Sequence, residues 1–290
     1  MRIAILHHSR TSVDRRNNAL ITYCGRFWKE YGHTVFHIDG RNEENADADI
    51  LILHVNLSVV PDQYFRIAAQ YPKVINSGVI NISKDTFSTL VVNAESGYNG
   101  PVIIKTRYNH GGFPEKESTV QDGLKNIKHN FRKLFLNNHW QHIEWMKKYI
   151  VLESVSMVPD AVWDNQHLVV EKFVPEKNDA GLYQVREWVF LGDSEIHYIN
   201  TSKEPVIRGY NSIHREYLME DEVPEELRET RKTLGFEYGK FDYVMHDGKP
   251  VLFDINKTPG TASNMKNRPG VNEIIREFSR GIDYFIKQVS

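Results

Sequence analysis

The chain of 290 residues is long enough for one large domain or two to three smaller ones. Its 36 basic residues nearly balance its 38 acidic residues, and the formal charge of −2 gives no support for a nucleic-acid surface. A single cysteine, Cys24, excludes an internal disulfide and a cysteine cluster for zinc. No apolar run approaches the ~20 residues that cross a bilayer, and the first residues turn polar too soon for a secretory signal. We therefore expect a cytoplasmic protein without nucleic-acid or membrane partners.

The first quarter of the chain alternates apolar strands with helices. Apolar residues over 17–34 recur at helical spacing until Gly32 supplies a stop. Strands and helices in this order predict a small open parallel sheet. The segment lacks the Gly-x-Gly-x-x-Gly pattern, so we do not expect a dinucleotide site. The apolar strands span 2–8, 34–39 and 49–55, and a further helix and strand follow over 62–77.

The rest of the chain contains two hairpin patterns. Alternating strands over 183–200 turn at Gly192-Asp193, and those over 238–256 turn at Asp247-Gly248. Within 101–114 we expect a strand followed by a Gly-containing polar loop, and within 167–179 a strand that runs into a charged turn. We also expect helix from 115 to about 150 and a closing helix over 271–288.

The later hairpin carries an acid and an amide near its end. Side chains alternate faces along a strand, so Asp254 and Asn256 point the same way. Positions equally far from a hairpin turn face each other, which places Asp242 across from residues 253–254. Oxygen ligands that converge in this way suit Mg²⁺, which proteins usually hold together with substrate phosphates. The alternative is that Asp254 and Asn256 only cap and begin a turn.

Two other stretches place charge at the ends of apolar strands. Lys105 follows "PVII" and precedes a polar Gly loop, where a cation suits a phosphate. The alternative is a lysine that snorkels at a strand edge. Glu171 and Lys172 in "VVEKFV" read either as solvated charges or as a hinge whose backbone groups contact a purine edge. Each pattern on its own leaves both interpretations open.

Taken in order, these motifs resemble the ATP-grasp superfamily, which includes D-alanine–D-alanine ligase and the ribosomal-protein glutamate ligases. The family's phosphate lysine ends a strand, as Lys105 does. Its adenine hinge reads as Glu, any residue and two apolar residues, which 171–174 matches. Its metal site is an acid in one strand and acid-x-Asn-x-x-Pro-Gly in the next, which Asp242 and 254–260 match. The resemblance covers roughly 76–270.

The resemblance implies an α/β (α+β) architecture, the ATP-grasp fold. A small N-terminal parallel α/β domain over 1–75 would precede two α+β lobes that clamp the nucleotide. The first of these would be a central lid lobe over 76–170. The second, over 171–290, would carry the metal site.

The resemblance also implies an ATP- and Mg²⁺-dependent carboxylate–amine ligase, with Mn²⁺ as an alternative metal. Such an enzyme forms an amide through an acylphosphate and releases ADP and phosphate. Its partners would be ATP and small-molecule carboxylate and amine substrates, with amino acids, peptides and acidic sugars all open, as is a homodimer. Two other functions stay open: a kinase on the same scaffold that phosphorylates a small-molecule hydroxyl, and a non-catalytic nucleotide-binding regulator.

The chain departs from the family pattern at three places. Asp254 stands where Glu is usual, and its shorter side chain can still ligate a metal. Thr86 falls where the first phosphate lysine belongs, with Lys84 as its substitute. The ribose acid falls near Gln184, so the resemblance leaves this role to an acid nearby. The two candidates for the ribose are Glu176 and Asp179.

Lys240 lies two residues before Asp242, so both side chains face the same way. Ligases similar to D-alanine–D-alanine ligase usually carry Arg here, against the acylphosphate. The alternative is that Lys240 pairs with Glu237 or Glu187 at the surface. The resemblance thus implies catalytic roles for Lys240 and Arg208, nucleotide binding by Lys84, Lys105, Glu171, Lys172, Phe173, Val174, Glu176, Asp179, Gln184 and Lys203, and metal binding by Asp242, Asp254 and Asn256.

The acceptor substrate is expected near 7–18 and 204–215, because arginines in these loops suit carboxylates bidentately. The alternative for each of them is a solvated arginine. The arginines are Arg15, Arg16, Arg208 and Arg215.

Overall fold

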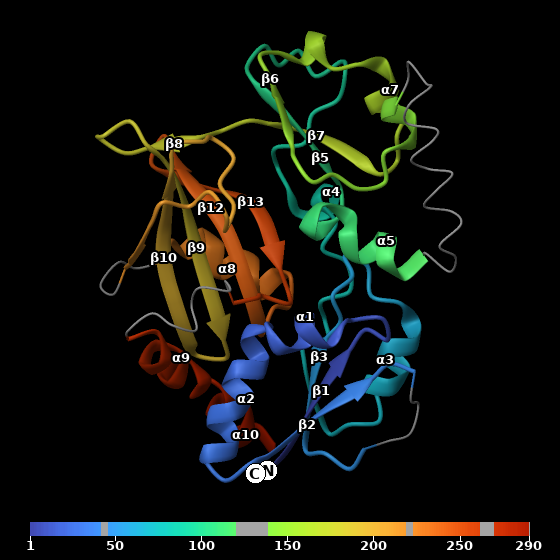
Figure 1. Cartoon of the computed structure of the whole chain (residues 1–290), viewed down its shortest axis with the longest axis vertical. Coiled ribbons are helices and arrows are strands. Elements are labelled where there is room, and N and C mark those ends of the chain that lie inside the picture. The colour runs from blue at the N-terminus through green and yellow to red at the C-terminus, as the bar shows by residue number, and fades with distance from the viewer. Residues whose placement is uncertain (42–45, 120–138, 219–222, 262–269, 290) are drawn as a thin grey trace. The chain divides into compact units, whose positions relative to one another are not determined.

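The structure, a computed structural model, describes the chain apart from residues 42–45, 120–138, 219–222, 262–269 and 290. The described residues form two compact units (Figure 1). We call Met1–Asn81 with Pro175–Ser290 the split unit, and Ile82–Val174 the middle unit. The three-part division expected from the sequence stays a prediction.

A parallel sheet opens the split unit, as the sequence predicts. Its strands follow the order β2-β1-β3-β4, and every neighbouring pair is parallel. Strands β1 and β3 are apolar and buried almost throughout, as expected for strands that are covered on both faces. The elements are β1 (Arg2–His7), α1 (Val13–Asn17), α2 (Leu20–Glu30), β2 (Thr34–Asp39), β3 (Ile50–His54), α3 (Asp62–Ala68) and β4 (Lys73–Ile75).

An antiparallel sheet forms the second part of the split unit. Its strand order is β11-β10-β9-β12-β13, and β8 also pairs with β9. Both predicted hairpins are confirmed, with the second turning at Asp247 and Gly248, whose φ angles are 50° and 74°. The strands are β8 (Glu176–Lys177), β9 (Tyr183–Leu191), β10 (Ser194–Ser202), β11 (His214–Tyr217), β12 (Tyr238–His246) and β13 (Lys249–Asn256).

Helices α2 and α9 (Val271–Ser279) and strands β1, β9 and β10 contribute to one apolar core. Within it the Trp28 ring nitrogen donates to the Ser279 carbonyl at 2.8 Å. From helix α8 (Glu225–Thr233), the Arg231 guanidinium lies 4.1 Å from the centroid of the Phe190 ring. The core therefore joins the parallel and antiparallel sheets into one unit.

The single closing helix predicted over 271–288 is wrong, because the chain forms α9 and then α10 (Ile282–Val289). Gly281 separates them. A side chain there would place its Cβ 2.0 Å from the Leu191 carbonyl oxygen. The break lets the backbone approach the sheet more closely than a continuous helix with larger residues would.

The middle unit is built on a three-stranded antiparallel sheet in the order β6-β5-β7. The helix predicted over 115–150 is confirmed only at its start. Residues 120–138 lie outside the described chain, and a 3-10 turn and strand β6 follow them. The elements are α4 (Lys84–Phe87), β5 (Val102–Thr106), α5 (Phe113–Thr119), β6 (Ile150–Leu152), α7 (Asp160–Trp163) and β7 (Leu168–Lys172), with 3-10 turns at Asn109–Gly112, His139–His142 and Val155–Met157.

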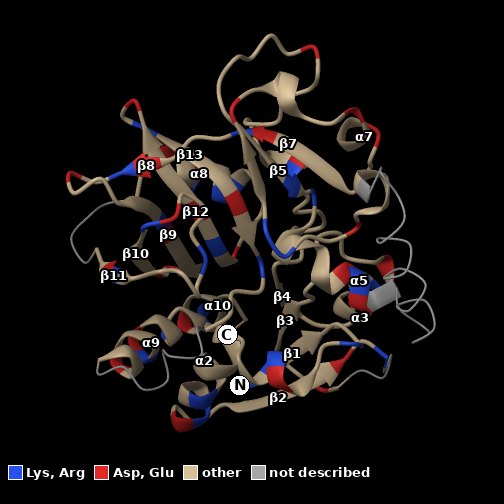
Figure 2. Ribbon diagram, turned by 45° about the horizontal axis from the view of Figure 1, so that its top comes forward, with Lys and Arg blue, Asp and Glu red and all other residues tan. Residues whose placement is uncertain are grey.

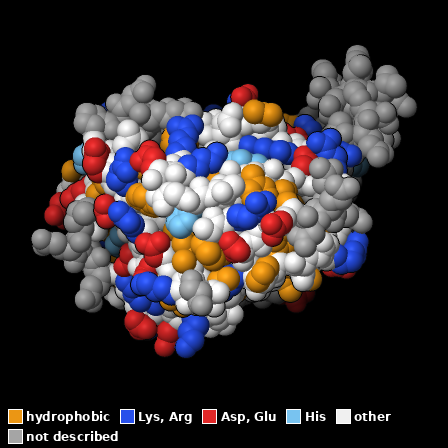
Figure 3. All heavy atoms as spheres, turned by 90° about the horizontal axis from the view of Figure 1, so that it is seen from below, with side chains coloured by type: hydrophobic (Ala, Val, Ile, Leu, Met, Phe, Trp, Pro, Cys, Tyr) orange, Lys and Arg blue, Asp and Glu red, His pale blue; other side chains and the backbone are white. Residues whose placement is uncertain are grey.

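Charges of both signs are interspersed on the face seen in Figure 3, with apolar side chains in small groups between them. Among the helices that the structure describes, none combines the length and the apolar character needed to span a membrane.

Candidate functional site

The β12–β13 hairpin brings the predicted metal ligands together. Asp242 pairs directly with Asp254 across the two strands, and Lys240 pairs with Asn256. An irregularity after Asp242 gives β13 one extra residue, Phe253, opposite the Asp242–Tyr243 step. The expected register is confirmed, and it places both carboxylates and the amide on one face of the sheet.

The surroundings of Asp242 disfavour a negative charge on its carboxylate. Burial is the main cause and raises the pKa of Asp242 to about 7; Lys240 opposes the rise, and the carboxylates of Glu187 and Asp254 add to it. A group of this kind is stabilised in its charged form by any further cation beside it. The arrangement therefore fits a divalent cation.

The loop after β13 fixes Asn256. The Asn256 side-chain oxygen accepts from the Thr258 amide at 2.8 Å, and the Thr258 hydroxyl donates to the Asn56 side-chain oxygen at 3.0 Å. Across the described residues, no group of three or more His, Cys, Asp or Glu side chains is placed to hold a metal ion. The predicted set instead combines two carboxylates with an amide, which suits a hard cation that also binds substrate oxygens.

Lys240 lies beside this set and contacts two acids. Its ammonium is 2.6 Å from Glu187 Oε2 and 2.9 Å from Asp242 Oδ1. The side chains of Lys240 and Glu187 are only 18% and 12% exposed, so the pair is not at the surface. Although burial works in the opposite direction, the carboxylates of Asp242 and Glu187 raise the pKa of Lys240 well above its usual value. Lys240 therefore keeps its positive charge. Glu237, the other acid suggested for it, pairs with Lys73.

Sequence reasoning missed the network behind Lys240. The Glu187 carboxylate accepts from the Tyr198 hydroxyl at 2.6 Å and also from the Asn200 amide. Arg215 donates to Asn200 Oδ1 at 2.9 Å and stacks over the Tyr198 ring at 4.1 Å. An acid in the middle of a predicted strand, as in "YQVREWVF", was the available signal for Glu187.

The middle unit holds a second pair of opposite charges on neighbouring strands, β5 and β7 (Figure 2). Lys105 Nζ lies 2.6 Å from Glu171 Oε2, and these side chains are 7% and 0% exposed. Neither carboxylate oxygen of Glu171 has a hydrogen-bond partner among the described residues beyond this ion pair. Lys105 thus does not snorkel to solvent, and Glu171 is not a solvated charge.

The backbone amides of the two residues after Glu171 are hydrogen-bonded within the middle unit. The amide of Lys172 donates to the Leu90 carbonyl, and that of Phe173 donates to the Pro101 carbonyl, each at 2.8 Å. The Lys172 ammonium lies 5.2 Å from the centre of the Tyr98 ring. Val174 is the last residue of the unit.

Lys84 and Thr86, the two residues considered for the first phosphate contact, differ in burial and in what their side chains contact. Lys84 is 2% exposed, and its ammonium lies 3.5 Å from the Tyr108 carbonyl. Thr86 lies in the same short helix and gives its hydroxyl to the Ser83 carbonyl at 2.6 Å. Of the two, Lys84 is the side chain that the fold directs toward the turn following β5.

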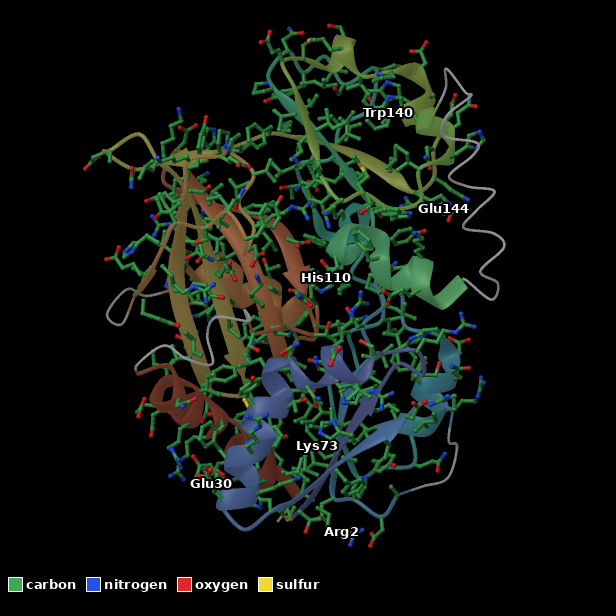
Figure 4. All side chains as sticks on the ribbon, in the orientation of Figure 1. Arg2, Glu30, Lys73, His110, Trp140 and Glu144 are labelled. Atoms are coloured by element: carbon green, nitrogen blue, oxygen red, sulfur yellow. The ribbon has the colours of Figure 1, made fainter. Side chains whose placement is uncertain are left out.

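That turn contains His110, labelled in Figure 4, and two glycines with positive φ angles. A Cβ on Gly111 would lie 2.2 Å from the Met146 carbonyl oxygen, and one on Gly112 would lie 2.7 Å from the Glu144 carbonyl oxygen. Packing within the middle unit therefore accounts for both glycines.

The residues proposed for the ribose lie on and beside β8 and β9. Glu176 accepts from Gln184 and from Arg186, each at 2.7 Å, and from the Met245 amide, also at 2.7 Å. Its carboxylate is thus already held by several donors. Asp179 is exposed in the turn between these strands.

The remaining predicted residues lie in the loop after β10 and on helix α1. Lys203 is exposed just beyond β10, and the Arg208 backbone amide donates to the Asn211 side chain at 2.7 Å. Arg16 pairs with Asp39 at 2.8 Å, while Arg15 is exposed on α1. Arg16 thus links α1 to the end of β2.

A histidine cluster lies where strands of the parallel sheet end. His7 Nε2 is 2.8 Å from His37 Nδ1, and the His7 and His54 rings are 5.2 Å apart. Burial lowers the pKa of His7 to about 2 and that of His54 to about 3, with the neighbouring histidines adding to the decrease. These rings are therefore neutral in the folded protein.

No family model matches the sequence, and a search of curated proteins finds no relative. Solved structures match along essentially the whole chain. The D-alanyl-alanine synthetase A from Vibrio cholerae O1 biovar eltor str. N16961 is 10% identical, with a TM-score of 0.55, over 100% of this chain and 98% of its own.

A D-alanine–D-alanine ligase from Bacillus anthracis is 13% identical, with a TM-score of 0.51, over 100% of this chain and 97% of its own. The D-cycloserine synthetase DcsG is 11% identical, with a TM-score of 0.51, over 99% of this chain and 100% of its own. At identities this low, the similarity establishes only the fold of the chain. The α/β architecture expected from the motifs is confirmed, and the chain has the ATP-grasp fold that D-alanine–D-alanine ligases share.

Proposed function

We propose that the protein is an ATP- and Mg²⁺-dependent carboxylate–amine ligase that forms an amide through an acylphosphate and releases ADP and phosphate. One observation carries the proposal. Asp242 and Asp254 face each other on the β12–β13 hairpin, with Lys240 and Asn256 as the next pair, in a chain with the fold of known ligases.

Asp242, Asp254 and Asn256 would hold the metal. A bound Mg²⁺ would neutralise charge that develops on the ATP phosphates. The hairpin makes this set rigid, because cross-strand pairing places Asp242 and Asp254 opposite each other and Thr258 fixes the Asn256 amide. Preorganised ligands of this kind need little rearrangement when the reaction occurs.

The middle unit would bind the nucleotide. Glu171 has carboxylate oxygens that can accept from an amino group, and the amide of Val174 would read the purine edge beside it. Lys105 and Lys84 would contact the phosphates, and Lys203 of the split unit is a further candidate. Asp179 suits the ribose better than Glu176, because the Glu176 carboxylate is already held by Gln184, Arg186 and Met245.

Lys240 and Arg208 would stabilise the reacting groups. A substrate carboxylate attacks the γ-phosphate and ADP leaves. An amine then forms a C–N bond at the acyl carbon and gives up a proton, and phosphate leaves as the C–O bond to it breaks. This chemistry needs no side-chain nucleophile, so positioning and fixed charge supply the catalysis. Lys240 fits this role because its side chain stays protonated and lies next to Asp242. Arg15, Arg208 and Arg215 remain candidates for the carboxylate substrate.

The proposal is tested with a matrix of amino acids, peptides and acidic sugars as carboxylates against a panel of amines, read by phosphate release. Hydroxylamine then replaces the amine in the active pairs. A hydroxamate is expected, because only an acylphosphate yields one. ADP formation with a phosphorylated hydroxyl and no hydroxamate would show a kinase instead. The absence of ADP release across the whole matrix would contradict catalysis and favour a nucleotide-binding regulator.

A further inference from the structure

We propose that Glu187 is a positioning residue that holds Lys240 beside the metal ligands, so that the lysine does not compete with a divalent cation for Asp242. The inference rests on the proposed metal site. It assigns a function to an acid that lies outside the predicted ligand set and faces Asp242 across β9 and β12.

The first step is that Glu187 itself is fixed. Its carboxylate accepts from Tyr198 and Asn200, which stand on the neighbouring strand β10. Asn200 is in turn held by Arg215 from β11. The acid is only 12% exposed, so water does little to replace these donors. Glu187 therefore keeps its place whether or not its other contacts change.

The second step is that Glu187 is the nearer partner of Lys240. The ammonium is 2.6 Å from Glu187 Oε2, against 2.9 Å and 3.1 Å from the two oxygens of Asp242. When a metal occupies the Asp242 oxygens, the lysine keeps one carboxylate on the same face of the sheet. It can therefore remain charged beside the metal without an acid from the ligand set.

The third step is the consequence of removing Glu187. A neutral group at this position leaves the Lys240 ammonium in contact with the Asp242 carboxylate. Lysine and metal would then compete for the same oxygens, because a cation in a site of low dielectric strongly disfavours a second one. The effect on metal binding must therefore depend on the presence of Lys240.

The test measures Mn²⁺ binding by electron paramagnetic resonance, with ADP present, in four proteins: wild type, Glu187→Gln, Lys240→Met and the double variant. We expect Glu187→Gln to weaken Mn²⁺ binding about tenfold when Lys240 is present, and less than about twofold in the Lys240→Met background. Equal losses in both backgrounds would overturn the inference, because Glu187 would then act as a remote charge or as a structural residue.

Two further variants make the result specific. Tyr198→Phe removes one hydroxyl that anchors Glu187 and keeps the ring, so a smaller loss, again absent in the Lys240→Met background, is expected even where Glu187→Gln folds poorly. Glu195→Gln is the matched control, because Glu195 belongs to the same hairpin but pairs with Arg228. It should leave Mn²⁺ affinity unchanged, and a loss equal to that of Glu187→Gln would count against the proposal.

Failure of the metal site itself gives a different result. If Asp254→Asn binds Mn²⁺ as tightly as wild type, the proposed ligand set is wrong. If Asp254→Asn loses binding while the Glu187→Gln losses are equal in both backgrounds, only the role of Glu187 is wrong.

Discussion

Two Lys–Glu pairs that lie away from solvent in the described chain differ in what surrounds the acid. Glu187 in the split unit is held by Tyr198 and Asn200 as well as by Lys240. Glu171 in the middle unit has its ion pair with Lys105, and its oxygens have no further hydrogen-bond partner among the described residues.

The difference separates two uses of a buried charge. Taking an ion pair out of water costs several kcal/mol, which good geometry and additional hydrogen bonds must offset. The Glu187 carboxylate has such bonds within the protein, so it is suited to fix Lys240. The Glu171 carboxylate has acceptor positions left, so it is suited to a ligand that donates hydrogen bonds.

Breaking the Lys105–Glu171 pair, whose acid has no further hydrogen bonds among the described residues, should have the largest effect on stability. Lys105→Met leaves Glu171 as an uncompensated charge that is 0% exposed, so we expect a loss of roughly 3–5 kcal/mol in the unfolding free energy of the middle unit. Hydrogen exchange followed separately in the two units measures it. ATP affinity, measured by calorimetry, should also fall.

The double variant Lys105→Met/Glu171→Gln is the control for this experiment. Neutralising both partners removes the buried charge and should recover much of the lost stability, but not the ATP affinity. If Lys105→Met alone keeps both stability and ATP affinity, the pair neither stabilises the middle unit nor binds the nucleotide.

Breaking the Lys240–Glu187 pair should affect catalysis. Lys240→Met removes a fixed cation whose charge matters most in the transition state, so we expect at least ~10²-fold loss in kcat with little change in KM for ATP. Steady-state kinetics with an active substrate pair measures it. A kcat within about twofold of wild type would reduce Lys240 to a structural partner of Glu187.

Lowering the pH should destabilise the split unit more than the middle unit, with a smaller effect than the substitutions above. The unfolded chain protonates its histidines near pH ~6.5, whereas His7 and His54 in the split unit take up protons only at about 2 and 3. Because the folded pKa is the lower one, stability is complete above pH ~6.5 and is lost as the pH falls below it. The loss is at most about 1.4 kcal/mol per pH unit for each histidine.

Hydrogen exchange at neutral pH and at about pH 5, corrected for intrinsic rates, measures this difference between the units. The split unit should lose more protection than the middle unit, and His54→Phe should reduce the loss. Equal losses in both units, unchanged by His54→Phe, would contradict the role of the cluster.

Local patterns predicted the hairpins and the register of Asp242 with Asp254, because two-residue turns and strand alternation are encoded in neighbouring residues. Resemblance to a family supplied the fold of the whole chain. The break at Gly281 was missed, because its cause is a close approach to Leu191, which is distant in sequence.

The environment of the candidate residues was not predictable for the same reason. The sequence suggested Glu187 as one of two partners for Lys240, but only at the surface. The shielding of this pair and the anchoring of Glu187 by β10 depend on the pairing of β9 with β10 and β12. The occupied carboxylate of Glu176 depends likewise on Met245, which is remote in sequence.

The proposed ligase depends above all on a catalytic metal site in the β12–β13 hairpin, and one pair of variants decides whether the site exists. Asp254→Asn removes a metal carboxylate without changing its shape, while Asp247→Asn changes an acid that is 90% exposed at the turn of the same hairpin. With an active substrate pair, ADP release should fall by ~10²-fold or more for Asp254→Asn and stay unchanged for Asp247→Asn. Near-wild-type ADP release from a folded Asp254→Asn protein would contradict the metal site and the ligase mechanism built on it.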